Sequence, residues 1–171
     1  KGQCRVLLSQ AETRYKRPLD KTEPLHAWVP RHASNSINRY RVGNGGRTPE
    51  QRRCGRKWRR PALEFGEQAM FRFVKAGGRK DDGEARSIRG VYVGHHERTG
   101  ASRSLTPEGM IRGTGVHKIL EVDRWNDTFL TSVKGLPWKP KTDVRALPNP
   151  AYADGEAPPA APMPIVMTLP R

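Results

Sequence analysis

Apolar side chains in the first third of the chain recur with the spacing of helices. Residues 3–17 predict one helix that Pro18 ends, because its apolar side chains fall on a single stripe. The stripe comprises Cys4, Leu7 or Leu8, Ala11 and Tyr15. A second helix is predicted from about Thr22 to Tyr40, with a kink or a restart at Pro30, which lacks an N–H group. Its periodic positions are Leu25, Val29, Ala33, Ile37 and Tyr40.

A turn and a short helix are predicted next. The Gly43-Asn44-Gly45-Gly46 stretch contains several residues that adopt positive φ at low cost, so it predicts a turn. Thr48 is suited to cap the helix that follows, with Pro49 at its first position and the acid Glu50 in its first turn. The helix is expected to end at Gly55.

From Phe65 onward the pattern changes to a period of two residues, which indicates strands. Strands are predicted at residues 65–74, 87–94, 103–106, 110–112 and 116–120, with turns at 97–100 and 106–109 and a loose connection at 77–83. This spacing predicts a small antiparallel barrel or curled sheet. A core of this size would be only marginally stable alone.

The C-terminal part has the composition of an extended segment. After Trp125 the pattern dissolves, and residues 136–171 hold nine of the 15 prolines, so they predict a polyproline-biased tail. The predicted fold class is therefore α+β. It comprises a basic helical segment at 1–61, a small antiparallel β-barrel at 62–130 and an extended Pro-rich tail at 131–171.

Positive charge is concentrated in the helical segment. The chain has a formal net charge of +15, and residues 1–61 carry 16 Lys and Arg against 4 Asp and Glu. Residues 62–130 are nearly balanced, with 11 against 10. A face of this density suits a polyphosphate partner, since each neutralised phosphate releases counterions. The alternative is a solvated or disordered basic arm that has no ligand.

The candidate nucleic-acid-binding residues lie around the short helix and the linker after it. Six cations occur within nine residues there, which is more than the dipole of a short helix requires. The candidates are Arg39, Arg41, Arg47, Arg52, Arg53, Arg56, Lys57, Trp58, Arg59 and Arg60. Trp58 is suited either to stack on a base or sugar or to pack the linker onto the barrel, and the sequence favours neither.

No arrangement of residues suited to catalysis or metal binding is found in the sequence. Cys4 and Cys54 form neither a disulfide framework nor a zinc motif, and the adjacent His95 and His96 would point to opposite faces of a strand. We therefore expect that the protein is not an enzyme and that it binds neither a metal ion nor a cofactor. Without a run of about 18 apolar residues, no membrane span is predicted. Two idle thiols favour a reducing intracellular compartment, the nucleus or the cytoplasm.

Five motifs occur in order along residues 4–125. They are Asn38-Arg39, Gly46-Arg47-Thr48-Pro49-Glu50, Phe65-Gly66-Glu67, Arg89-Gly90-Val91-Tyr92-Val93-Gly94 and Thr106-Pro107-Glu108-Gly109. This series resembles the integrase region of copia-type retrotransposon polyproteins. The resemblance implies the end of an RNase H-like core joined to a small SH3-like barrel. It also implies DNA integration, in which the barrel and the basic linker assist DNA binding and multimer assembly.

The catalytic residues of that family have no counterpart in this chain. The family holds divalent metal ions with two aspartates and a glutamate. The acids of residues 1–61 are Glu12, Asp20, Glu23 and Glu50, which lie in expected caps, faces or turns. We therefore expect a truncated, non-catalytic fragment that binds DNA or RNA with weak sequence preference. The alternative is a structural subunit of a large ribonucleoprotein or other assembly, held by its basic surface and extended tail.

Overall fold

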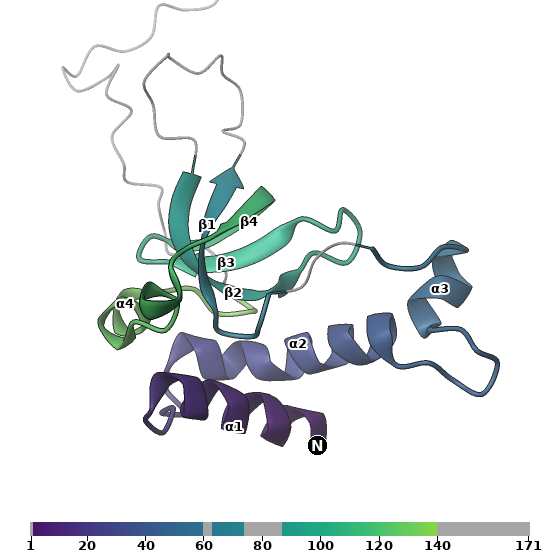
Figure 1. Ribbon diagram of the computed structural model, residues 1–171, viewed down its shortest axis with the longest axis horizontal. Coiled ribbons are helices and arrows are strands. Elements are labelled where there is room, and N and C mark those ends of the chain that lie inside the picture. Colours follow the sequence, from purple (N-terminus) through teal and green to yellow (C-terminus); the bar gives the residue numbers. More distant parts are fainter. Residues whose placement is uncertain (1, 60–62, 74–86, 140–171) are drawn as a thin grey trace, which may run out of the picture.

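The computed structural model describes residues 2–59, 63–73 and 87–139, and the chain is α+β with its helices first, as predicted (Figure 1). The helices are α1 (Gly2–Tyr15), α2 (Pro24–Tyr40), α3 (Pro49–Cys54) and α4 (Asp127–Ser132), with a 3-10 turn η1 (Glu121–Asp123). The strands are β1 (Gln68–Phe73), β2 (Ser87–His95), β3 (Ser102–Thr106) and β4 (Gly109–Lys118). The predicted connection at 77–83 and the tail from residue 140 lie outside the described residues.

Helices α2 and α3 begin and end close to where local signals place them, whereas α1 ends at Tyr15 and not at the predicted residue 17. In α2, Pro24 occupies the first turn, and the helix continues through Pro30, so the restart considered there does not occur. In α3, the Thr48 side chain accepts a hydrogen bond from the Gln51 amide at 3.1 Å. Gly55 then ends α3 in the left-handed conformation, at φ 74°. The predicted cap, first-turn proline and terminal glycine of α3 are thus confirmed.

The four strands form an antiparallel sheet in which β1 pairs with β2, β2 with β3 and β3 with β4. Strand β1 also pairs with β4, so the order β1-β2-β3-β4 closes on itself. Two strand predictions need correction. The first strand begins only at Gln68, because Phe65 and Gly66 form a turn with Gly66 at φ 86°. The strands predicted at 110–112 and 116–120 are one continuous strand, β4.

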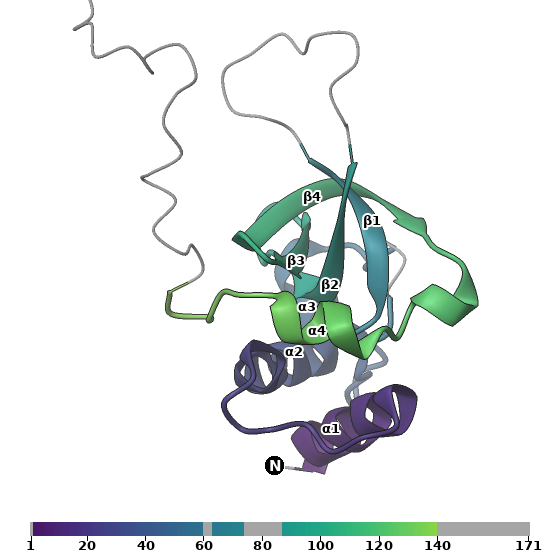
Figure 2. The same ribbon diagram turned by 90° about the vertical axis from the view of Figure 1, so that its left-hand side faces the viewer.

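One hydrophobic core joins the helices to the sheet. Helices α1 and α2 form a layer on one side of the strands, and Leu25, Trp28 and Val29 of α2 pack with Val91 and Val93 of β2 (Figure 2). A smaller cluster on the opposite side of β2 contains Ala69, Phe71 and Tyr92. The period-two pattern therefore predicted the strand β2 correctly, but both faces of this strand are buried. The helical segment and the sheet thus share a core across the predicted boundary at 61/62.

The segment after Trp125 is folded as far as residue 139, which corrects the prediction that the pattern dissolves there. Helix α4 is capped by the Asn126 side chain, which accepts a hydrogen bond from the Phe129 amide at 3.0 Å. Leu130 and Val133 are buried in the shared core. Helix α4 has only six residues, and the local signal that could have found it is the Asn126 cap, which is of the same kind as the Thr48 cap of α3.

Gly90 of β2 is a position where the sheet leaves no room for a side chain. A Cβ atom there would lie 2.9 Å from the Ser104 Cβ and 3.1 Å from the Leu105 carbonyl oxygen. We expect Gly90→Ala to lower the free energy of unfolding by about 1–3 kcal/mol, because the backbone of β3 must move. Gly115→Ala on β4 is the matched control, since its Cβ would meet nothing closer than 3.6 Å. Equal losses in urea unfolding of the two variants would contradict this explanation.

Candidate nucleic-acid interface

The basic segment, residues 41–59, leaves the C-terminal end of α2, turns, forms α3 and returns toward the sheet. It projects from the end of the molecule that is remote from α4 (Figure 1). Its turn is closed by hydrogen bonds from the Gly43 amide to the Arg47 carbonyl and from the Gly46 amide to the Gly43 carbonyl. No side chain of α3 is buried, so the helix presents most of its surface to solvent.

Six cations of the basic segment are exposed, and among the described residues they have no ion-pair partner. They are Arg41, Arg47, Arg52, Arg56, Lys57 and Arg59. None of them forms an ion pair with a carboxylate of the described residues. Because their charges are not compensated locally, they give this end of the molecule a positive potential.

Arginines on the other elements are used differently. Arg14 pairs with Glu64 at 2.9 Å, Arg17 with Glu23 at 2.6 Å, and Arg103 with Glu97 at 2.6 Å. The first pair joins α1 to the segment before β1, the second lies in the connection between α1 and α2, and the third joins β3 to the turn after β2. Other unpaired cations of the described ranges lie on separate elements, for example Arg5 on α1, Arg72 on β1 and Arg112 on β4. The dense, uncompensated cluster is therefore a property of the basic segment.

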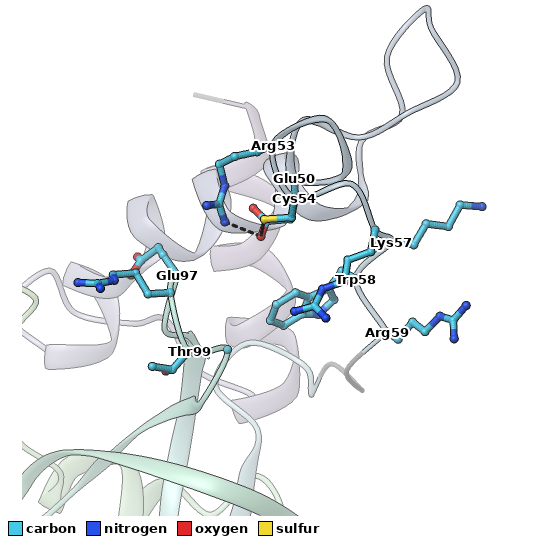
Figure 3. Close-up of a pocket in the computed structure, with 11 residues that line it drawn as sticks. Glu50, Arg53, Cys54, Lys57, Trp58, Arg59, Glu97 and Thr99 are labelled. Carbon is cyan, nitrogen blue, oxygen red and sulfur yellow. Dashed lines mark hydrogen bonds and ion pairs between the residues drawn. The ribbon is translucent and has the colours of Figure 1, made fainter.

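Trp58 anchors the linker that follows α3. Its ring lies 3.8 Å from the Arg39 guanidinium and meets the His95 ring edge-on at 5.1 Å. Figure 3 shows the Trp58 ring turned toward the fold, while the flanking Lys57 and Arg59 side chains point away from it. Of the two roles expected for Trp58, these contacts support packing of the linker. The same packing holds its two cationic neighbours outward.

Three candidate residues differ from the exposed cations. Arg39 is only 7% exposed and stacks on Trp58. Arg53 is exposed but bonded to Glu50 at 2.8 Å, one turn earlier on α3. Arg60 lies outside the described residues. Six of the ten candidates are thus surface cations that form no ion pair within the described ranges.

A pocket of about 420 Å³ lies between α3, the linker and the turn after β2 (Figure 3). The turn contributes Glu97, Arg98 and Thr99. Glu97 accepts hydrogen bonds from Arg103 of β3 and Arg31 of α2. Burial alone would raise the pKa of Glu97, but these bonds hold it well below its usual range. The turn itself was predicted from the sequence, but its position beside α3 was not, because nothing in its local pattern indicates that proximity.

His32 is a partly buried histidine on α2 that contacts β2. Its ring packs against Phe65 with centroids 4.8 Å apart, and its Nδ1 lies 3.3 Å from the Val93 carbonyl oxygen. Burial lowers the pKa of His32 to about 4, although the hydrogen bond to Val93 opposes the shift.

The lowered pKa of His32 predicts a dependence of stability on pH. The unfolded state, with a His pKa of about 6.5, binds the proton more readily than the folded state. The contribution of His32 to the free energy of unfolding is thus complete above about pH 6.5. It decreases by roughly 2–3 kcal/mol as the pH falls toward about 4. In urea unfolding across this range, His32→Gln should show a correspondingly shallower pH dependence than the wild type. Parallel curves for the two proteins would contradict the assignment.

The described residues contain no cluster of three or more His, Cys, Asp and Glu side chains that could hold a metal ion. None of the helices in the described ranges combines the length and apolarity that a bilayer crossing requires. Cys4 is partly buried and Cys54 is exposed, and both are free thiols.

Comparison of the chain with protein-family models, with curated proteins and with solved structures gives no match, so its functional interpretation rests on the geometry described above.

Proposed function

We propose that this chain is a non-catalytic protein that binds nucleic acid through its basic segment. The observation that carries the proposal is the group of six exposed cations within residues 41–59, none of them paired with a described carboxylate. Lys and Arg heads held in solvent are suited to neutralise backbone phosphates, and such binding depends little on base sequence. An origin in a copia-type integrase remains a prediction from the motif order.

The architecture supports this proposal by holding the basic segment in place. Thr48 and Gly55 cap the two ends of α3, and Trp58 anchors the linker against Arg39 and His95. Cations on a backbone that is already ordered lose less conformational entropy on binding than cations on a disordered arm. We further propose that the closed four-stranded sheet is a small barrel of the SH3-like class that supports α2 and the linker.

Salt dependence tests the proposal. Binding of a fluorescent mixed-sequence DNA duplex, followed by anisotropy, should weaken roughly 10²- to 10³-fold between about 50 and 200 mM salt if four to six phosphates are contacted. An RNA duplex of the same sequence should show a similar slope, since the proposed contacts are to phosphates. A duplex affinity that is independent of salt, or no binding at the lowest salt, would contradict the proposal.

A further inference from the structure

Arg39 is a buried cation that forms no ion pair with a described residue, although the charges of Glu50 and Glu97 act on it. It lies in the last turn of α2, and its described hydrogen bond runs from Nη2 to the His96 carbonyl at 3.5 Å, the limit of such a contact. Burial lowers its pKa. Stacking on Trp58 covers a face of the guanidinium, but cation–π contact compensates only part of the cost of burying a charge.

Arg39 lines another, smaller pocket of about 160 Å³. The side-chain donors around this pocket are Asn35, Asn38 and Arg39 of α2, Arg53 of α3 and Arg98 of the turn after β2. The pocket shares Arg53 and Arg98 with the larger pocket of Figure 3. Its volume is several times the roughly 30 Å³ that a water molecule occupies in the liquid, so a five-atom anion fits.

The two carboxylates that line this pocket are already bonded. Glu50 accepts from Arg53, and Glu97 accepts from Arg103 and Arg31. Five arginines therefore surround two glutamates, and Arg39 and Arg98 have no ion pair with a described residue. The surroundings of the pocket thus carry an excess of positive charge, and its lining contains several hydrogen-bond donors.

We propose that this pocket binds one phosphate group of the nucleic-acid backbone, held between Arg39 and Arg98 with Asn35 and Asn38 as additional donors. The proposal rests on the proposed function and adds one discrete phosphate-binding site to it. Trp58 covers a face of the Arg39 guanidinium and not its edge, where the described hydrogen bond is the 3.5 Å contact from Nη2 to the His96 carbonyl. The edge is the part that binds phosphate oxygens in a bidentate manner. The exposed cations of the basic segment would then contact neighbouring phosphates.

Inorganic phosphate is the first probe. In ¹H–¹⁵N spectra of the arginine Nε–Hε groups, added phosphate should shift Arg39 and Arg98 together, with one saturating affinity. Phosphate that leaves the Arg39 resonance unchanged, or that shifts only exposed arginines such as Arg56 without saturation, would overturn the proposal.

Arg98→Gln gives the second test, because Arg98 is exposed and its loss does not disturb the core. We expect about a tenfold loss of duplex affinity, in line with a strong charge-assisted contact. Arg5→Gln, which removes an equal charge from α1, should lose less than about threefold. If the duplex binds the wild type and Arg98→Gln equally, the assignment of the phosphate-binding site is wrong while the proposed function stands. If the duplex does not bind the wild type, the proposed function itself is wrong.

Discussion

Neutralising the basic segment is expected to remove most binding to a DNA duplex. The variant carries Arg52→Gln, Arg56→Gln, Lys57→Gln and Arg59→Gln. In a plot of log affinity against log salt concentration, each phosphate contact contributes about 0.9 to the slope. The loss of four contacts therefore lowers the affinity on the order of 10³-fold near 0.1 M salt. The fold should persist, because these four side chains are exposed and make no ion pair with the described residues. Anisotropy with the labelled duplex measures the loss.

Two controls separate the position of the charge from its amount. A variant with lysine at Arg52, Arg56 and Arg59 keeps the charge and should retain most of the affinity, because phosphate binding of this kind requires a cation and not a particular one. A second variant removes four charges elsewhere, with Arg5→Gln, Lys21→Gln, Arg72→Gln and Arg112→Gln. It should bind much more tightly than the neutralised basic segment. Equal losses in the two neutralised variants would show that only net charge matters.

The largest effect on stability is expected from Trp28→Ala. Trp28 is 1% exposed in the shared core, and its Nε1 donates a hydrogen bond to the Gly135 carbonyl at 2.9 Å. Removal of a buried aromatic side chain of this size costs about 3–5 kcal/mol. Trp138→Ala is the matched control, since Trp138 is 74% exposed, and it should change stability by less than about 0.5 kcal/mol. Urea unfolding monitored by circular dichroism compares the two variants.

The same unfolding experiment tests whether helices and sheet are one cooperative unit. Because α1 and α2 share their core with β2, β3 and α4, we expect far-ultraviolet and aromatic signals of the wild type to change in one coincident transition. A first transition that removes helical signal while the sheet remains folded would contradict the shared core.

Elements with strong local signals could be predicted from the sequence. The ends of α3 are fixed by Thr48, Pro49 and Gly55, each of which acts on its immediate neighbours. The stripe of α1 was also correct, because Leu7 and Ala11 are buried as their spacing indicates. Such features depend on residues within one or two turns of the helix, so one sequence is sufficient to find them.

Features that depend on distant parts of the chain could not be predicted in this way. Helix α4 is short, and besides its local cap at Asn126 it is held by the burial of Leu130 against residues far away in the sequence. The stacking of Trp58 on Arg39 is likewise set by tertiary packing, which brings the linker back over the end of α2. Two roles for Trp58 were therefore equally compatible with the sequence until its neighbours were known.

The candidate site shows the same division. The exposed cations of the basic segment were identified by composition alone. The neighbouring pocket could not be identified in this way, because Glu97 and Arg98 come from a turn some forty residues later in the chain. Hydrophobic patterns are local and do not show which distant segments come into contact. Nor could composition separate the paired Arg53 from the unpaired Arg52 beside it.

The most direct test of the central claim is to map where a nucleic acid contacts the chain. Backbone amide shifts of the ¹⁵N-labelled protein, recorded while an unlabelled DNA duplex is added at low salt, locate the contact surface residue by residue. We predict that the largest shifts fall within residues 41–59 and the turn at 96–100, and that added salt reverses them. Shifts concentrated on α1, η1 or the outer face of β4, with the basic segment unchanged, would contradict the account.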